Sequence, residues 1–537
     1  MLHLSGEHVY PVEPLDENSA TALFSERAQD ADPHFRPDPA DKAAIRQICR
    51  RLDGLPLAIE LGASRTRTLT PTELLGRLDR RLPLLTGGPR DLPARQQTLR
   101  ATLEWTVDLL DREQTRDLLH IAVFTGGCTL EAAEAVCGTT IERLSALIDH
   151  SLLQHNATAT GSRYAMLETI REYAIEALER TDRVETLRRM HADFFCDLAV
   201  RTEPELEGPA QANWLRSLDD DHDNLRAALE WCFGGGDAEL GARLVGSLWR
   251  FWYLRGHLAE GLRWAERALA ANPKASPSLE SKLLRAAAIL AQQRGDLRAT
   301  AEMTTRRLAV ARTQGDAQEV AACLNNLGLV AIGEDDIRRA ERLLRKSVSV
   351  FGEAGEDASF RARIDVPLGN LSWVALIVGD LMGAETFASE SMAIARSRGD
   401  VEQIIAMTLV LSLIRIQAEQ FGEAVELVED AFRLADPLDS KTIFCTLCTP
   451  TAILIARKRN FERAAHVLGK RLALRDEIGR PRDWFHYRVL EDTEKRVRRE
   501  LGEETFLEAL AVGARADVRE LFESTLKDAE RPSFATG

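Results

Sequence analysis

The chain has 537 residues, of which 45% are hydrophobic, 28% are charged and 6% are aromatic. This composition excludes a disordered or fibrous protein, and the length predicts roughly three to four domains. The 69 basic residues are outnumbered by 84 acidic ones, which gives a formal charge of −15 and disfavours nucleic acid as a general partner.

Membrane, secretion and disulfide signals are weak. The longest apolar run lies around residues 404–414 and is too short to span a bilayer. The first residues, MLHLSGEHVYPVEP, lack the pattern of a signal peptide. Eight cysteines are too sparse for a disulfide framework. We therefore expect a cytoplasmic protein with reduced thiols and no membrane contact.

The first 93 residues predict a small helical unit. An extended segment at Val9–Val12 precedes a helix that Asp16 caps. A later helix stops at Gly54, which suits a left-handed helix end, and the next helix covers Leu57–Ala63. The Gly- and Pro-rich stretch 83–93 is expected to be a linker.

The next unit has the pattern of a winged helix. Two strands are predicted on either side of a polar turn at Asn156–Ser162, and a helix follows at Leu167–Leu178. Four helices are expected before the hairpin, at Thr98–Leu110, Arg112–Val123, Leu130–Cys137 and Ile141–Ser151.

An internal repeat follows. Six apolar anchor residues are separated by 39, 40, 44, 40 and 40 residues: Leu258, Leu297, Ile337, Leu381, Phe421 and Phe461. Three positions after each anchor is a small side chain, which lets helices approach closely: Gly261, Thr300, Ala340, Ala384, Ala424 and Ala464. The pattern predicts a tetratricopeptide-type α-solenoid. The expected fold class is therefore mostly α, with a helical domain and a winged-helix domain before the solenoid.

Several segments resemble bacterial NB-ARC-type STAND signalling ATPases and LuxR-type transcriptional regulators with tetratricopeptide repeats. They are Leu15–Ala28, Gly54–Leu61, Thr98–Leu110, Ala122–Cys137 and Tyr164–Ala174. The resemblance implies a domain order of a nucleotide-binding-domain edge (1–15), an NB-ARC-type helical domain (16–93), a winged helix (94–185), a helical connector (186–240), the solenoid (241–480) and a helical tail (481–537).

In the resembled family a P-loop ATPase domain precedes the helical domain, and Met1 falls just past it. No G-x-x-x-x-G-K-[ST] motif occurs: Gly469-Lys470 is followed by Arg471, and Leu215–Asp221 is too polar for a Walker B strand. We expect no catalytic residues, no metal site and no ATP hydrolysis by this chain alone.

ATP or ADP is the cofactor that the resemblance implies for the full-length family, and none is expected on this chain alone. Pro56 in the GLPL-like motif Gly54–Leu57 is the candidate nucleotide-contacting residue, because the family's proline packs near the adenine. A plain helix–Gly–Pro–helix junction explains the same residues. Leu167 replaces a histidine that approaches the phosphate in many relatives, and leucine cannot donate that hydrogen bond.

Other patterns favour structural roles. The candidate recognition helix Ile141–His150 has Glu142 and Asp149 against one Arg143, so DNA contact is not expected. Cys445 and Cys448 are expected in a helix core, and DDDHD at 219–223 in an acidic helix start. The charged stretch 491–500 is expected to face solvent. Core packing is also favoured over a binding anchor for Trp249, Phe251, Trp252, Tyr253 and Trp264.

These features together predict a regulatory scaffold that binds a protein or small-molecule signal on its solenoid, with an ATPase domain in trans as a further partner. It would act in transcriptional control without contacting nucleic acid. Three alternatives remain: a C-terminal fragment of an ATP-hydrolysing regulator, a DNA-binding regulator, and a freestanding tetratricopeptide adaptor.

Overall fold

The computed structural model describes residues 14–78, 84–85, 98–353, 362–480 and 488–530, and it is mostly α-helical, as predicted. The predicted segment Val9–Val12 and most of the linker 83–93 lie outside these ranges. The chain forms two compact units, one of Met1–Phe195 with Asp220–Ala228 and one of Cys196–Asp219 with Leu229–Gly537. The finer domain boundaries given above stay predictions.

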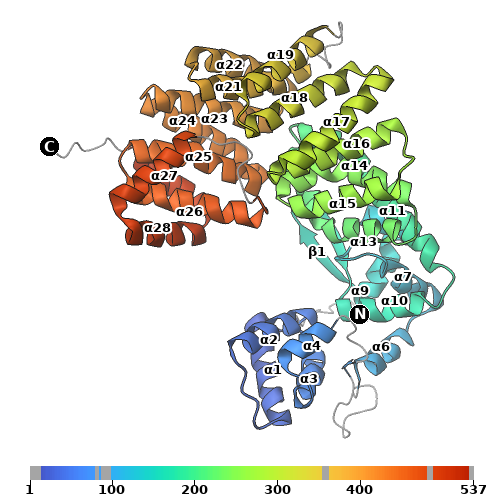
Figure 1. Cartoon of the computed structure of the whole chain (residues 1–537). Coiled ribbons are helices and arrows are strands. Elements are labelled where there is room, and N and C mark those ends of the chain that lie inside the picture. The colour runs from blue at the N-terminus through green and yellow to red at the C-terminus, as the bar shows by residue number, and fades with distance from the viewer. Residues whose placement is uncertain (1–13, 79–83, 86–97, 354–361, 481–487, 531–537) are drawn as a thin grey trace, which may run out of the picture. The chain divides into compact units, whose positions relative to one another are not determined.

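The first unit begins with four short helices (Figure 1). The predicted cap is confirmed, because the Asp16 carboxylate accepts hydrogen bonds from the backbone N–H groups of Asn18 and Ser19. Proline starts three of the helices, where its missing N–H costs nothing. Their bounds are α1 Glu17–Ala31, α2 Pro39–Arg51, α3 Pro56–Ser64 and α4 Pro71–Arg77.

The winged-helix elements follow in the predicted order. They are α6 Leu99–Val107, α7 Arg112–Ile121, α8 Leu130–Cys137, α9 Ile141–Asp149, β1 Gln154–Thr158, β2 Gly161–Ala165 and α10 Glu168–Leu178. The hairpin turn is shorter than the predicted Asn156–Ser162, because Asn156 pairs with Arg163 and Thr158 with Gly161. The β1 residues are mostly exposed, so a polar sequence is compatible with a strand there.

The solenoid repeat is confirmed in register. Each of the six anchors is the first residue of the second helix in a pair, and all six small residues three positions later are buried. The pairs are α14 Ala238–Arg255 with α15 Leu258–Ala271, α16 Pro277–Gln293 with α17 Leu297–Gln314, α18 Ala317–Gly333 with α19 Ile337–Glu353, α21 Asp365–Val378 with α22 Leu381–Arg398, α23 Val401–Gln417 with α24 Phe421–Ala435, and α25 Lys441–Arg457 with α26 Phe461–Glu477.

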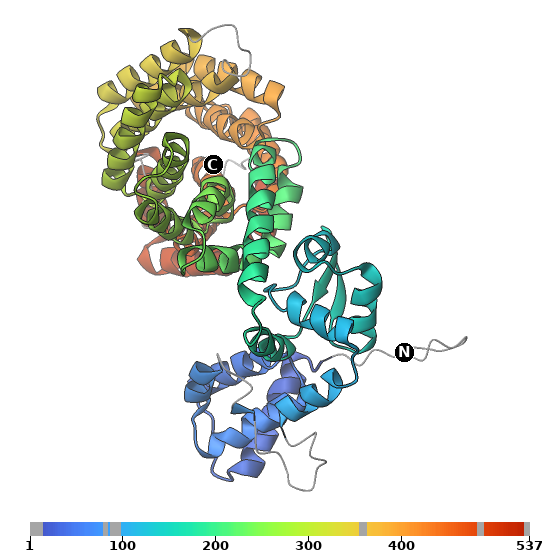
Figure 2. The same cartoon turned by 90° about the vertical axis from the view of Figure 1, so that its right-hand side faces the viewer.

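Within the second unit these pairs follow a curved path that brings α25 back against α14 (Figure 2). Thr442 Oγ1 donates a hydrogen bond to the Tyr253 carbonyl at 2.9 Å, and Arg255 Nη1 donates one to the Leu438 carbonyl at 2.6 Å. The first pair therefore contacts the sixth pair and the segment that joins the fifth pair to the sixth. As a result, inward-facing side chains of the intervening pairs surround a common space.

Further helices complete the two units. The helices before the solenoid are α11 Val184–Thr202, α12 Gln211–Asp220 and α13 His222–Phe233, with the short helix η3 Pro204–Glu207, and those after it are α27 Arg488–Leu501, α28 Glu503–Arg515 and α29 Val518–Glu530. Helix α28 crosses α26 where Gly469 faces Leu510 and Gly513 faces His466, backbone against backbone. Gly469 of the Gly469-Lys470 pair is therefore a helix-crossing residue. Among the described helices, none combines the length and apolarity needed to cross a bilayer.

Candidate functional site

The second unit contains a cavity of about 450 Å³ on the inner side of the solenoid. Most of its lining comes from the first helices of consecutive pairs, α14, α16, α18, α21 and α23. The charged lining residues are five arginines and four carboxylates: Arg250, Arg285, Arg307, Arg363, Arg398, Glu207, Glu319, Asp400 and Glu402. The remainder includes Trp249, Tyr253, Phe351 and several amide side chains.

One side of the cavity is organised by Arg250 of α14. Its guanidinium lies 2.7 Å from Glu402 Oε2 and 3.6 Å from Glu207 Oε1. Arg398 reaches Asp365 at 2.9 Å. Burial raises the pKa of Glu402, against the opposing effect of Arg250. Because these arginines and carboxylates are paired with one another, their side chains are held in place and form this wall of the cavity.

A second ion pair in the cavity lining joins α17 to α18. Arg307 of α17 is 1% exposed, and its Nε donates a hydrogen bond to Glu319 Oε2 at 2.7 Å. Ser281 Oγ donates to the same oxygen at 2.9 Å. Burial alone would raise the pKa of Glu319, but Arg307 and Arg285 lower it below its usual value. Glu319 is therefore ionised and engaged near neutral pH.

Arg285 of α16 is held less completely. Its Nη2 lies 3.4 Å from Glu203 Oε1, while its buried Nε has no hydrogen-bond partner. Its guanidinium carbon lies 5.8 Å from the Trp249 ring centre. Burial, followed by the positive charge of Arg307, lowers the pKa of Arg285. A negatively charged acceptor beside Arg285 would supply the missing hydrogen-bond partner and would raise its lowered pKa.

Amide side chains contribute another part of the lining. Asn370 Nδ2 donates a hydrogen bond to Asn325 Oδ1 at 2.8 Å, and Asn325 Nδ2 donates one to Asn326 Oδ1 at 3.3 Å. Gln403 Nε2 donates to Ser391 Oγ at 2.9 Å. Amides both donate and accept, so this wall can bind a ligand that also has both kinds of group.

Pro56, the sequence candidate for nucleotide contact, is an exposed residue at the start of α3 in the first unit. Gly54 before it has φ +66°, and a side chain there would collide with the Leu15 carbonyl. Leu167 precedes α10 and supplies no cap. Instead Asp53 Oδ2 accepts a hydrogen bond from the Thr169 backbone at 3.2 Å, which brings the GLPL-like turn to the start of α10. Asp53 was not among the residues predicted from the sequence.

The candidate recognition helix α9 has its one arginine directed toward the domain core. Arg143 Nε lies 3.0 Å from Oδ2 of the fully buried Asp117, and Nη1 lies 3.6 Å from Glu113 Oε2. In the hairpin, Arg163 pairs with Asp221 at 2.9 Å, and both are buried. The exposed part of α9 is left with residues such as Ile141, Glu142 and Ser145.

The remaining sequence patterns have structural partners. Cys445 and Cys448 are buried in α25, as expected. Each aspartate at 219–223 has a polar partner. Three form ion pairs, Asp219 with Arg255, Asp221 with Arg163 and Asp223 with Arg226, and Asp220 accepts a hydrogen bond from Thr160. In α27, Lys495 and Arg499 are exposed.

Most of the aromatic group is buried, as core packing predicts: Trp249, Phe251, Trp252 and Trp264 are core residues. Trp249 and Tyr253 in addition line the cavity. Trp264 stacks against Phe233. The cavity arginines were not predicted from the sequence. The one signal for them is an arginine inside an otherwise apolar helical stretch, as at Arg250 and Arg285.

Comparison with known proteins bears on the helices and hairpin described above. Residues 110–179 match the winged helix-turn-helix domain family. This segment is a winged helix-turn-helix domain. A protein of Mycobacterium tuberculosis classed as an HTH-type transcriptional regulator is 35% identical over 269 residues, which cover 49% of this chain and 30% of the relative. An uncharacterized M. tuberculosis protein is 37% identical over 188 residues, 33% of this chain and 48% of that protein. The matched segments thus span less than half the length of these relatives.

Two solved structures match this chain at low identity and with TM-scores below 0.5. A STAND protein with a tetratricopeptide repeat sensor from Pyrococcus horikoshii gives a TM-score of 0.43 at 14% identity, covering 96% of this chain and 72% of that one. A Rap protein complexed with competence and sporulation factor gives 0.42 at 12%, covering 68% and 93%. The winged helix-turn-helix domain and its regulator relatives fit the resemblance stated from the sequence.

Proposed function

We propose that this chain is a regulatory, signal-sensing scaffold whose solenoid cavity binds a small molecule or a segment of a protein. The observation that carries the proposal is the cavity itself. About 450 Å³ is within the usual range of small-ligand sites, and its lining combines rings, amides and charges from five consecutive helix pairs. Because the wall is shared among pairs, a ligand there changes contacts along the whole array.

The regulated process is transcription, and the chain itself catalyses no reaction. Similarity to a protein classed as an HTH-type transcriptional regulator supports the first part. The sequence has no P-loop motif, which supports the second. An ATPase domain supplied in trans would meet the surface around Pro56, and DNA would be contacted by a partner and not by α9.

Native mass spectrometry of the full chain, recovered from its source cells, tests ligand binding. Ala322 lies on the cavity wall, so Ala322→Trp should fill the space and exclude the ligand. Met382, which is 82% exposed on α22, provides the matched control Met382→Trp. We expect a bound mass on the wild type and on Met382→Trp that Ala322→Trp lacks. Equal retention by all three proteins would place the ligand elsewhere.

A further inference from the structure

Arg285 is the cavity arginine whose hydrogen-bonding capacity is least used. Its carboxylate neighbour, Glu203, is shared: Oε2 accepts from Lys282 Nζ at 2.9 Å and from Ser247 Oγ at 3.1 Å. Only the longer 3.4 Å contact from Oε1 is left for Arg285 Nη2. The buried Nε has no partner. A buried donor without an acceptor costs folding free energy, so a binding site is a sufficient reason for it to persist.

The arginines of the lining are paired to different degrees. Five arginines and four carboxylates line the cavity, and two further carboxylates, Glu203 and Asp365, contact Arg285 and Arg398. Arg307 is engaged by Glu319, and Arg363 lies 3.3 Å from Glu207. Arg285 is therefore the least engaged guanidinium of the lining. The paired N–H groups of a guanidinium match the two oxygens of a carboxylate.

We propose that the cavity binds a ligand through one carboxylate held by the guanidinium of Arg285, a proposal that rests on the signal-binding function above. The Trp249 ring, which Arg285 and Arg250 both approach within 6 Å, forms an apolar wall beside that guanidinium. The amides of Asn325 and Asn326 lie along α18 in the same lining. The lining therefore suits a ligand that has a carboxylate, an apolar side chain and an amide close together. An N-acylated amino acid has these three groups, either as a free molecule or as the carboxyl terminus of a peptide.

Isothermal titration of the full chain tests this chemistry with defined probes. N-acetyl-phenylalanine and the peptide Ala-Ala-Phe are each compared with their carboxyl-terminal amides. We expect each acid to bind at least tenfold more tightly than its amide, because the amide removes the charge and one acceptor. The tighter of the two acids distinguishes a free acyl amino acid from a peptide terminus, and either result supports the carboxylate site.

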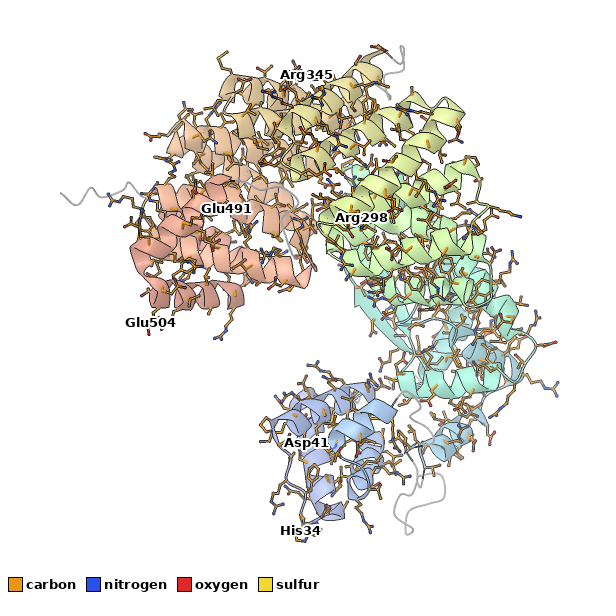
Figure 3. All side chains as sticks on the ribbon, viewed as in Figure 1. His34, Asp41, Arg298, Arg345, Glu491 and Glu504 are labelled. Carbon is orange, nitrogen blue, oxygen red and sulfur yellow. The ribbon has the colours of Figure 1, made fainter. Side chains whose placement is uncertain are left out.

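Arg285→Gln should weaken binding of both acids at least tenfold and leave the amides unchanged. Arg298→Gln, which removes an exposed arginine of α17 (Figure 3), is the matched control and should bind as the wild type does. Arg285→Lys keeps the charge but loses the planar guanidinium with its paired N–H groups, and we expect an intermediate affinity. Thermal unfolding of each variant verifies that it is folded.

Equal affinity of the wild type for acids and amides would overturn the inference, and so would undiminished acid binding by folded Arg285→Gln. The acid-to-amide ratio of the wild type remains decisive even if Arg285→Gln does not fold. If the native ligand is retained by the wild type and lost in Ala322→Trp while no acid preference is found, the carboxylate inference fails and the signal-binding function stands.

Discussion

Arg143 Nε lies 3.0 Å from Asp117 Oδ2 in an ion pair, and the same oxygen accepts a hydrogen bond from Thr139 Oγ1 at 2.8 Å. Asp117 is fully buried, so it holds the only arginine of α9 against the domain. A helix that reads DNA needs cationic groups for the phosphates. The ion pair leaves α9 without one.

We therefore expect the full chain not to bind duplex DNA. Fluorescence anisotropy with a labelled duplex of about 30 base pairs, from low to physiological salt, measures this directly. Asp117→Ala would release Arg143 and should lower the free energy of unfolding by about 2–4 kcal/mol, because it removes the partner of a half-buried charge. Wild-type affinity that falls steeply with salt and is lost in Arg143→Ala would contradict the prediction.

The purified chain should neither hydrolyse ATP nor bind it tightly. The sequence lacks a P-loop to hold the phosphates, and Leu167 has no polar group to approach them. Calorimetry with ATP and ADP, together with a phosphate-release assay, checks both parts. Micromolar affinity that Pro56→Ala weakens would instead show that the exposed turn before α3 contacts the nucleotide.

Replacing a small residue at the solenoid crossings should overpack them. Ala424 and Ala464 are fully buried three positions after their anchors, so Ala424→Leu and Ala464→Leu should each destabilise the second unit by about 1–3 kcal/mol. Ala270→Leu on the exposed side of α15 is the control, and we expect less than about 0.5 kcal/mol. Unchanged urea midpoints for both buried substitutions would show that these crossings have spare room.

The crossing of α26 and α28 has no room even for a methyl group. A side-chain carbon at Gly513 would collide with the His466 carbonyl, and one at Gly469 with the Leu510 carbonyl. Gly513→Ala should therefore lower the thermal midpoint, by an amount that corresponds to about 1–3 kcal/mol or more. At Gly422 in α24 nothing lies within 4 Å, so Gly422→Ala should be neutral or stabilising. Equal midpoints for the two variants would refute the close crossing.

Asp365 should make part of the stability depend on pH. Burial raises the pKa of Asp365 to about 6, although Arg398 opposes this. Since the unfolded value is near 3.9, the folded state binds the proton more tightly. The contribution of this group is fully present below about pH 4 and is lost as the pH rises through about 6.

The comparison with Asp365→Asn isolates this group, because asparagine has a similar shape and does not titrate. The unfolding free energy of the wild type minus that of Asp365→Asn should fall between pH 4 and pH 7 and then level off. Urea midpoints across that range measure the difference, with Glu504→Gln as an exposed control (Figure 3). A difference that rises with pH would show that Arg398 outweighs burial.

Local sequence patterns were sufficient to predict the helices, the order of the winged-helix elements and the register of the solenoid. These depend on local periodicity: each anchor such as Leu258 or Phe461 begins a helix, and each small residue three positions later is buried. Most contacts in such an array join neighbouring pairs, so a pattern of about 40 residues contains the information needed to place each pair against the next.

The cavity was decided by tertiary structure alone. Arg250 and Glu402 are 152 residues apart and meet at 2.7 Å because the curved solenoid brings distant pairs together. Curvature accumulates from small rotations between pairs, and no residue pattern in one repeat records their sum. The same holds for Asp117 and Arg143: only their packed positions show that the arginine is engaged, whereas the sequence showed only that the helix had few cations.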